Sequence, residues 1–167
     1  AGCTYTALKT VAAALEKNGI YTEIFHVGTA PIKGCMGCGS CSRTGSHQCI
    51  TTQDTVNEAI MKAKEADGIV VGSPVHYAAA SGDITSFLDR LFYAGYPMAG
   101  KVGAAVVSCR RGGATAALDQ LNKYFTIAQM PVVSSNYWNM VHGNTPEEVL
   151  RDEEGIQTMQ LLGENMA

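Results

Sequence analysis

Short apolar segments that alternate with helical segments constrain the fold of this chain more than any other feature. Residues 69–71 (Ile-Val-Val) form a continuous apolar run typical of a strand buried on both faces, and residues 102–107 have a similar character. Apolar residues at helical spacing follow the first run, at Ile84, Phe87 and Leu91. This alternation predicts an α/β fold, in which helices cover both faces of a parallel sheet.

The remaining elements are expected in the same alternating order. Asp54 is expected to cap one helix, and residues 145–148 (Thr-Pro-Glu-Glu) have the pattern of a capping box with proline at the first helical position. No repeat or linker divides the chain, so we expect one domain over residues 1–167. The expected helices cover residues 8–15, 54–63, 84–91, 118–128 and 145–167, and the expected strands cover residues 21–27, 69–71, 102–107 and 131–133.

The charge balance limits the partners of this chain. It has 12 Lys and Arg against 15 Asp and Glu, a net charge of -3, and therefore no broad basic face for nucleic acid or anionic lipid. No apolar run approaches the roughly 20 residues of a membrane-spanning helix, and no signal peptide is recognisable. We expect a cytoplasmic protein with small-molecule partners, and neither nucleic acid nor membrane among them.

The loops that follow the strands are the candidate ligand sites, because ligands of open α/β sheets bind beyond the carboxyl ends of the strands. One such segment is residues 2–6, at the start of the first helix. Its free amides, the helix dipole and the hydroxyls of Thr4 and Thr6 could hold a phosphate. A plain helix cap is the simpler alternative for these residues.

Two further loops are expected at the same edge of the sheet. In the first, Pro74 fixes a turn, and His76 and Tyr77 could flank a flat ring. In the second, residues 108–113, two glycines permit close approach of a ligand and two arginines supply charge for a phosphate or an anionic ring. A lone histidine is more often structural, and arginines in loops are usually solvated. The prediction of a ligand site therefore depends on the expected meeting of the three loops at one edge of the sheet.

A cysteine-rich loop, residues 34–50, follows the expected strand at residues 21–27 and should also lie at that edge. Three cysteines at C-x2-C-x2-C can hold one face of an iron-sulfur cluster, and a fourth could close the shell. Zinc, free thiols and reversibly paired thiols are the alternatives. Cys3 and Cys109 are expected to be loop or core thiols. The four clustered cysteines are Cys35, Cys38, Cys41 and Cys49.

Other catalytic patterns are absent from the sequence. It contains no G-x-x-x-x-G-K-[ST] phosphate loop. Gly37 and Gly39 begin a dinucleotide-binding pattern, but Ser42 stands where that pattern requires glycine. No Ser/His/Asp set is recognisable, and we name no catalytic residue.

Four segments together resemble a known family. They are similar to segments of NAD(P)H-dependent FMN reductases in the flavodoxin-like superfamily, and most similar to the branch that includes the iron-sulfur flavoproteins and multimeric flavodoxins. The resemblance covers essentially the whole chain. The segments are Ser73-Pro74-Val75-His76-Tyr77, Arg110-Arg111-Gly112-Gly113-Ala114-Thr115, Asn136-Tyr137-Trp138-Asn139 and the cysteine loop.

The resemblance implies FMN as the cofactor. It puts Thr4 and Thr6 near the FMN phosphate, with Cys3 where the family often has Asn, and it implies that Trp138 shelters the flavin ring. It also implies a [4Fe-4S] cluster on the four clustered cysteines, although relatives with similar loops are expected to carry FMN alone. The residues implied to line the ribityl chain and the flavin ring are Pro74, Val75, His76, Tyr77, Ser108, Arg110, Arg111, Gly112 and Gly113.

The implied activity is hydride transfer from NAD(P)H to FMN and passage of electrons to a second flavin, a quinone or another acceptor. The alternative is an electron carrier that holds FMN and a cluster without NAD(P)H activity of its own. A metal-binding or redox-sensing module without flavin is a third hypothesis. The resemblance also implies a homodimer or a homotetramer.

The implied fold is a flavodoxin-like, doubly wound sheet of five parallel strands in the order 2-1-3-4-5, where the first strand lies between the second and the third. The first expected element of this chain is a helix. We therefore expect that the N-terminal strand and part of the last helix are missing from this sequence, which leaves a gap in the sheet.

Overall fold

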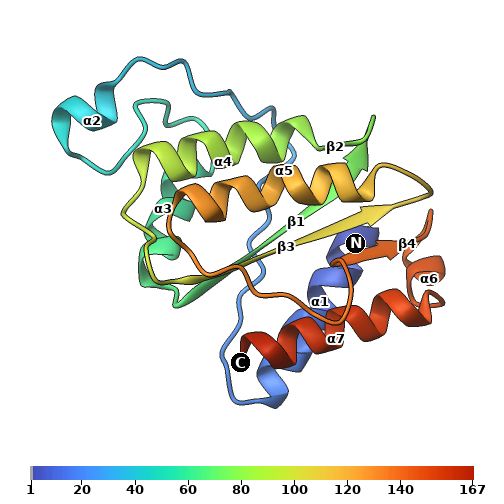
Figure 1. Ribbon diagram of the computed structural model, residues 1–167. Helices are drawn as coiled ribbons and strands as arrows, with labels where there is room; N and C mark the ends of the chain where they lie inside the picture. The colour runs from blue at the N-terminus through green and yellow to red at the C-terminus, as the bar shows by residue number, and fades with distance from the viewer. Residues whose placement is uncertain (1) are drawn as a thin grey trace.

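Helices cover both faces of a central sheet in the computed structural model of the protein, which describes residues 2–167 (Figure 1). The strands lie in the order β2-β1-β3-β4. Strand β1 (Gly68–His76) is parallel to β3 (Val102–Cys109), and β3 is parallel to β4 (Met140–His142). The short β2 (Ala79–Ala80) turns back against the end of β1. The predicted α/β class with a mainly parallel sheet is confirmed.

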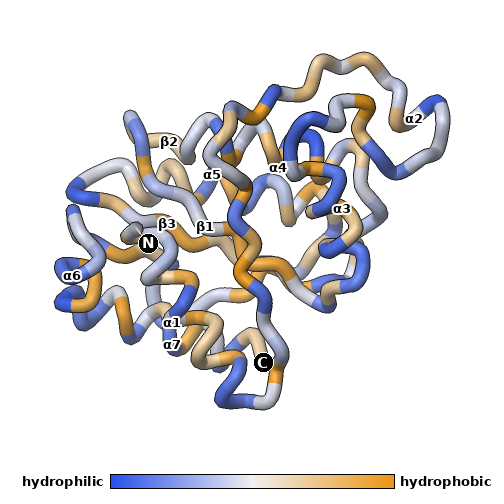
Figure 2. Tube along the Cα trace, turned by 180° about the vertical axis from the view of Figure 1, so that it is seen from behind, coloured by the Kyte–Doolittle hydropathy of each residue, from blue (hydrophilic) through white to orange (hydrophobic). Residues whose placement is uncertain are grey.

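Two groups of helices bury the two faces of the sheet. Alternate residues of β3 divide between two apolar clusters, with Ala105 and Val107 in the first and Ala104 and Val106 in the second. Burial on both faces explains the apolar composition of this strand, which Figure 2 shows as a hydrophobic stretch between the helices. The first cluster includes α3 (Val56–Glu65), α4 (Gly82–Ala94) and α5 (Ala114–Ile127), and the second includes α1 (Cys3–Lys17), α6 (Pro146–Val149) and α7 (Glu153–Met166).

Residues 21–27, which the sequence predicted to be a strand, form none. The segment still contributes to the core, because Phe25 and Val27 pack against the first apolar cluster. A strand needs a paired neighbour, and β2 pairs with only the last two residues of β1. The rest of that edge, residues 68–74, has no neighbouring strand within residues 2–167, at the position where the flavodoxin-like order has its first strand. The sheet therefore has four strands instead of five.

Residues 131–133, also predicted to be a strand, make only an isolated bridge between Val132 and Gly103. The parallel neighbour of β3 is instead β4, which lies outside the helices and strands that the sequence predicted. The Val107 amide donates a hydrogen bond to the Asn139 carbonyl at 3.0 Å, and the parallel pairing of β3 with β4 begins directly after it, at Met140. The loop before β4 is thereby attached to the carboxyl half of β3.

The helix that was predicted from residue 145 to the end consists of two helices. Thr145 begins α6 as the capping box predicts, since its hydroxyl accepts a hydrogen bond from the Glu148 amide at 3.3 Å. A second cap ends the continuity, because the carboxylate of Asp152 accepts from the Gly155 amide at 3.1 Å and starts α7. Within residues 2–167, no helix has the length and apolar character that crossing a membrane requires.

Candidate functional site

The three candidate loops meet at the carboxyl edge of the sheet. The hydroxyl of Thr4, in the first turn of α1, lies 2.7 Å from the hydroxyl of Ser108 in β3. The loop after β3 also touches the turn between β1 and β2, because a Cβ added to Gly113 would lie 2.6 Å from the Cα of Ala78. The structure therefore brings together loops that are far apart in the sequence.

The N-terminus of α1 is suited to an anion. Gly2 is the N-cap residue, and no side chain accepts a hydrogen bond from the first turn. The hydroxyl of Thr6 donates to the Gly2 carbonyl at 3.3 Å and leaves the helix amides free. Glycine is itself a common N-cap residue, so a plain helix cap stays an alternative for this segment. Free amides at the positive end of a 15-residue helix are suited to hold a phosphate.

The turn between β1 and β2 presents an aromatic ring to the solvent. Tyr77 and Ala78 both have left-handed backbone conformations, with φ of 49° and 60°, and the Tyr77 side chain is fully exposed. Ser73 fixes the base of this turn, because its buried hydroxyl donates to the Pro74 carbonyl at 2.8 Å and accepts from the Ser81 amide at 2.9 Å. A strained turn on a rigid base can hold an aromatic ring against a flat ligand.

The turn after β3 adds positive charge at the same edge. Arg110 and Arg111 are exposed, and the buried Cys109 thiol donates to the Gly112 carbonyl at 3.0 Å. Gly113 ends the turn with φ of 91°, a conformation in which a side chain would be strained. Free amides at a helix N-terminus, an exposed aromatic ring and two arginines together fit a planar ligand that carries a phosphate.

The loop before β4 presents two more aromatic rings. Tyr137 and Trp138 are exposed and meet edge to face, with their ring centroids 5.2 Å apart. The Ser135 hydroxyl is 2.8 Å from Oδ1 of the buried Asn139, which anchors the loop. Cys3, the first residue of α1, is a half-buried thiol whose Sγ lies 3.7 Å from the Gly143 carbonyl oxygen.

The cysteine loop lies over α4, at the other end of the molecule from the turn between β1 and β2. Its pocket includes Arg90 and Tyr93 from the second half of α4, and Figure 1 shows its helix α2 (Ser40–Thr44) far from β2. The prediction that this loop joins the other loops at the carboxyl edge is therefore wrong. It assumed that residues 21–27 form a strand that ends at that edge, and no such strand forms.

The four clustered cysteines line one small pocket, with a volume of about 20 Å³. Four thiols around one pocket fit the ligand set of an iron-sulfur cluster in kind and in number. They do not converge on one point, because within residues 2–167 no three His, Cys, Asp or Glu side chains are grouped closely enough to hold a metal ion. The lining thiols are the exposed Cys35 and Cys38 and the half-buried Cys41 and Cys49.

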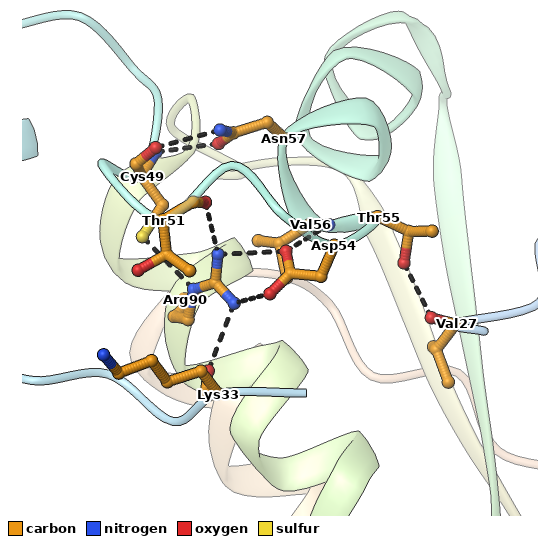
Figure 3. A network of polar contacts seen from close by, with 9 residues as sticks. All are labelled: Val27, Lys33, Cys49, Thr51, Asp54, Thr55, Val56, Asn57 and Arg90. Atoms are coloured by element: carbon orange, nitrogen blue, oxygen red, sulfur yellow. Dashed lines mark hydrogen bonds and ion pairs between the residues drawn. The ribbon is translucent and has the colours of Figure 1, made fainter. Parts of the chain in front are cut away.

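A buried arginine forms part of the wall of this pocket (Figure 3). Arg90 is 1% exposed, and its guanidinium pairs with the Asp54 carboxylate, with Nη2 3.0 Å from Oδ1 and Nη1 against Oδ2. Its Nε donates to the Sγ of Cys49 at 3.2 Å. The guanidinium also donates to the carbonyls of Lys33 at 3.1 Å and Thr51 at 2.7 Å. One side chain therefore joins both ends of the cysteine loop.

The network changes the acidity of two side chains. Burial raises the pKa of the Cys49 thiol, but the hydrogen bond from the Thr51 backbone and the hydrogen bond and charge of Arg90 together lower that pKa below its usual value. Burial also raises the pKa of Asp54, but the hydrogen bonds from Arg90 and the Val56 amide, and the charge of Arg90, lower it more. The network therefore shifts both groups toward their anionic forms relative to their ordinary pKa values.

Sequence reasoning missed Arg90 and gave Asp54 a different role. The N-cap of α3 is Thr55, and Asp54 accepts from the Val56 amide at 3.2 Å while it pairs with Arg90. The signal for Arg90 was its position, three residues after Phe87 on the buried stripe of α4. A charged residue at an inward helix position requires a buried partner.

A second contact fixes the far side of the cysteine loop. The ring of His47 stacks on the ring of Tyr96, with centroids 4.2 Å apart and planes at 17°. His47 Nδ1 is also 3.1 Å from the carbonyl oxygen of Gly95, directly after α4. Arg90 therefore attaches the two ends of the loop to α4, and His47 attaches its second half to the segment after α4.

The fold and the arrangement of its carboxyl edge define a flavodoxin-like α/β protein. A family model described as NADPH-dependent FMN reductase matches residues 1–145. The chain therefore belongs to the NADPH-dependent FMN reductase family, a family of FMN-binding oxidoreductases, as its motifs predicted.

Known proteins agree with this assignment. A curated relative, an iron-sulfur flavoprotein of Methanocaldococcus jannaschii, is 31% identical over 99% of this chain and 89% of its own length. A flavodoxin structure from the domain Archaea has a TM-score of 0.63 and 17% identity, covering 98% of this chain and 87% of that one. The NAD(P)H:quinone oxidoreductase from Methanothermobacter marburgensis has a TM-score of 0.67 and 14% identity, covering 99% and 90%. The two structures establish the flavodoxin-like fold alone.

Proposed function

We propose that this protein is an FMN-dependent oxidoreductase that passes reducing equivalents from NAD(P)H through FMN to a flavin, a quinone or another small acceptor. The observation that carries the proposal is the meeting of the three loops at the carboxyl edge, where Thr4 is hydrogen-bonded to Ser108. Membership of the FMN reductase family supports it. Bound FMN supplies the chemistry of accepting a hydride and passing electrons on.

The residues of the three loops would bind and orient the cofactor. The free amides of α1, with the hydroxyls of Thr4 and Thr6, would hold the FMN phosphate. The turn between β1 and β2 and the turn after β3 would hold the ribityl chain and the flavin ring, and the two arginines would place positive charge beside the ring. No side chain is assigned as a proton donor. The residues of these two turns are Pro74, Val75, His76, Tyr77, Ser108, Arg110, Arg111, Gly112 and Gly113.

A neighbouring subunit would complete this site. The exposed rings of Tyr137 and Trp138 are available for contact with a flavin or with a second chain, which supports this part of the proposal. We propose a homodimer or a homotetramer in which Trp138 shelters the flavin ring. Each subunit would contribute one FMN-binding domain, residues 1–167, and would act in the cytoplasm.

The cysteine loop would hold a [4Fe-4S] cluster as a second redox centre. The pocket lined by all four thiols supports this, and so does the name of the relatives, iron-sulfur flavoprotein. Cys35, Cys38, Cys41 and Cys49 would be its ligands after the loop closes around it. Zinc, free thiols and reversibly paired thiols are the alternatives, and FMN binding would not depend on which of them holds.

An electron carrier with FMN and a cluster is the second candidate function. The cysteine pocket favours it, because a second centre could exchange single electrons with a protein partner. Anaerobic mixing of the flavin-loaded protein with NADPH, and separately with NADH, distinguishes the two functions. An enzyme loses its flavin absorbance directly on mixing, whereas a carrier keeps it until a partner reductase is added.

The role of the arginine turn, residues 108–113, can be tested by titration with FMN. A variant with Arg110→Ala and Arg111→Ala should bind FMN more weakly than the unchanged protein, because it removes both charges beside the proposed ring. Lys123→Ala is the matched control, since it removes an exposed charge from α5, well after the loop. Equal FMN affinity in all three proteins would count against the proposed site.

A further inference from the structure

Fold stability does not explain why Arg90 is buried on α4. The side chain is 1% exposed on the stripe that also carries Phe87 and Leu91. Taking a charged group out of water costs several kcal/mol, and replacing a buried ion pair by packed apolar residues is often neutral or stabilising. An apolar residue would serve the packing of α4 at least as well.

Two hydrogen bonds of Arg90 join the two ends of the cysteine loop, at Lys33 and Thr51. Nη1 donates to the carbonyl of Lys33, two residues before Cys35. Nη2 donates to the carbonyl of Thr51, two residues after Cys49. The guanidinium is planar and rigid, so it fixes the separation of the two carbonyls. Arg90 therefore holds the two ends of the cysteine loop together.

The remaining donor of Arg90 is directed at a sulfur atom. Nε lies 3.2 Å from the Sγ of Cys49, and Asn57 holds the main chain of the same cysteine with hydrogen bonds of 2.8 Å and 2.9 Å. Within residues 2–167, no such hydrogen bond reaches the sulfur atoms of Cys35, Cys38 or Cys41. Cys49 is thus attached to α3 and α4 through its backbone and its side chain. The C-x2-C-x2-C segment is instead held from within the loop, where Arg43 donates to the Cys38 carbonyl at 2.7 Å.

We propose that Arg90 is the positioning residue of the cysteine site, where it holds Cys49 as the fixed ligand onto which the C-x2-C-x2-C segment closes when a soft metal ion or a cluster binds. The inference rests on the proposed role of the cysteines and adds a residue outside their motif. Hydrogen-bond partners of metal ligands typically change metal affinity about 10- to 100-fold when they are mutated. A residue that only supports the fold would change stability without such a loss.

Titration of the full chain with Co²⁺, after reduction and removal of any cluster, tests this inference. Thiolates bind divalent transition-metal ions such as Co²⁺, and the charge-transfer absorption of the complex reports that sulfur is a ligand. Arg90→Met keeps an unbranched side chain and removes every donor. Arg90→Lys keeps the charge and loses the planar fork. Leu88→Ala is the control, because Leu88 is equally buried on α4 but does not line the pocket.

The unchanged protein should bind Co²⁺ through thiolates, and Arg90→Met should bind it about 10-fold more weakly or worse. Arg90→Lys should fall between the two. Leu88→Ala should lower the free energy of unfolding, yet stay within roughly 2-fold of the unchanged affinity, because the site is not touched. Affinities are compared under conditions in which every variant is folded.

Two results would overturn the positioning role alone. Arg90→Met could bind Co²⁺ as tightly as the unchanged protein, or Leu88→Ala could lose as much affinity as Arg90→Met, which would be an effect of stability. If the unchanged protein bound no Co²⁺ through thiolates, both the cysteine site and the inference would be overturned. The proposal for FMN would not be affected.

Discussion

The hydroxyls of Thr4 and Ser108 are 2.7 Å apart and join the N-terminus of α1 to the carboxyl end of β3. The two residues are 104 positions apart in the sequence. Ser108 is buried, so the bond is protected from water on that side. It links the proposed phosphate site to the turn that carries Arg110 and Arg111.

Replacing each hydroxyl measures this link. Thr4→Val and Ser108→Ala should each lower the free energy of unfolding by about 1 kcal/mol, the typical net value of a hydrogen bond. The double variant should lose less than the sum, because both changes remove the same bond. Urea unfolding measures stability, and titration with FMN should show weaker binding for each variant.

Thr10→Val is the control for these two variants. It removes the hydrogen bond from the Thr10 hydroxyl to the Thr6 carbonyl, 3.0 Å, farther along α1. We expect a change in stability without a change in FMN affinity. Losses that simply add in the double variant of Thr4 and Ser108 would mean that the hydroxyls act independently.

Gly113→Ala tests the contact between the two turns. The new Cβ would face the backbone of Ala78 at 2.6 Å, in addition to the strain at φ of 91°. Gly100→Ala is the control, because Gly100 has φ of 83° and nothing within 4 Å of a new Cβ. Gly100→Ala should cost about 1 kcal/mol of unfolding free energy, and Gly113→Ala should cost more and weaken FMN binding. Equal costs in urea unfolding would argue against a close contact of the turns.

The buried pair of Arg90 and Asp54 should respond strongly when one partner is removed. Arg90→Met leaves the Asp54 carboxylate, 5% exposed, without its counter-charge, and should cost about 3–5 kcal/mol of unfolding free energy. Adding Asp54→Leu to Arg90→Met should recover part of that loss. Lys62→Met breaks the exposed pair with Glu23 and should cost much less, because water and salt screen exposed charges. A small loss in Arg90→Met would contradict the buried pairing.

The same pair predicts a dependence of stability on pH. The pKa of Asp54 is 3.8 when unperturbed and lower in the folded chain, so the unfolded chain binds the proton more readily. The contribution of Asp54 is therefore complete above the unfolded pKa and is lost as the pH falls through the folded pKa. Urea unfolding measures the free energy of unfolding of the unchanged protein and of Asp54→Asn from about pH 6 to about pH 3. The difference in favour of the unchanged protein should shrink as the pH falls. A constant difference between the two proteins would show that the pKa of Asp54 is not lowered.

Strands β1 and β3 could be predicted because each contains a continuous apolar run, and β3 is buried along nearly its whole length. Residues 21–27 also contain apolar side chains but lack a paired neighbour, and pairing is not visible in a local pattern. The prediction of a strand over residues 21–27 is therefore wrong, although Phe25 packs, partly buried, against the core. The break between α6 and α7 follows from the Asp152 cap, which lies among other acidic residues and gives no separate signal.

The loops at the carboxyl edge could be predicted from topology, since every parallel strand ends at that edge. The place of the cysteine loop could not, because it depends on Arg90, a residue of α4 that contacts Lys33 and Thr51 across the chain. Periodicity describes one element at a time. A charged residue on the inward stripe of a helix is the signal that such a long-range contact exists.

The central claim is that the carboxyl edge binds FMN and that NAD(P)H reduces it there. The most direct test is anaerobic mixing of NADPH with the full chain after loading with FMN, followed by flavin absorbance. The account predicts that the protein retains FMN and that its absorbance bleaches on mixing, more slowly or less completely in the variant with Arg110→Ala and Arg111→Ala. A protein that retains no FMN when the cofactor is added in excess would contradict it.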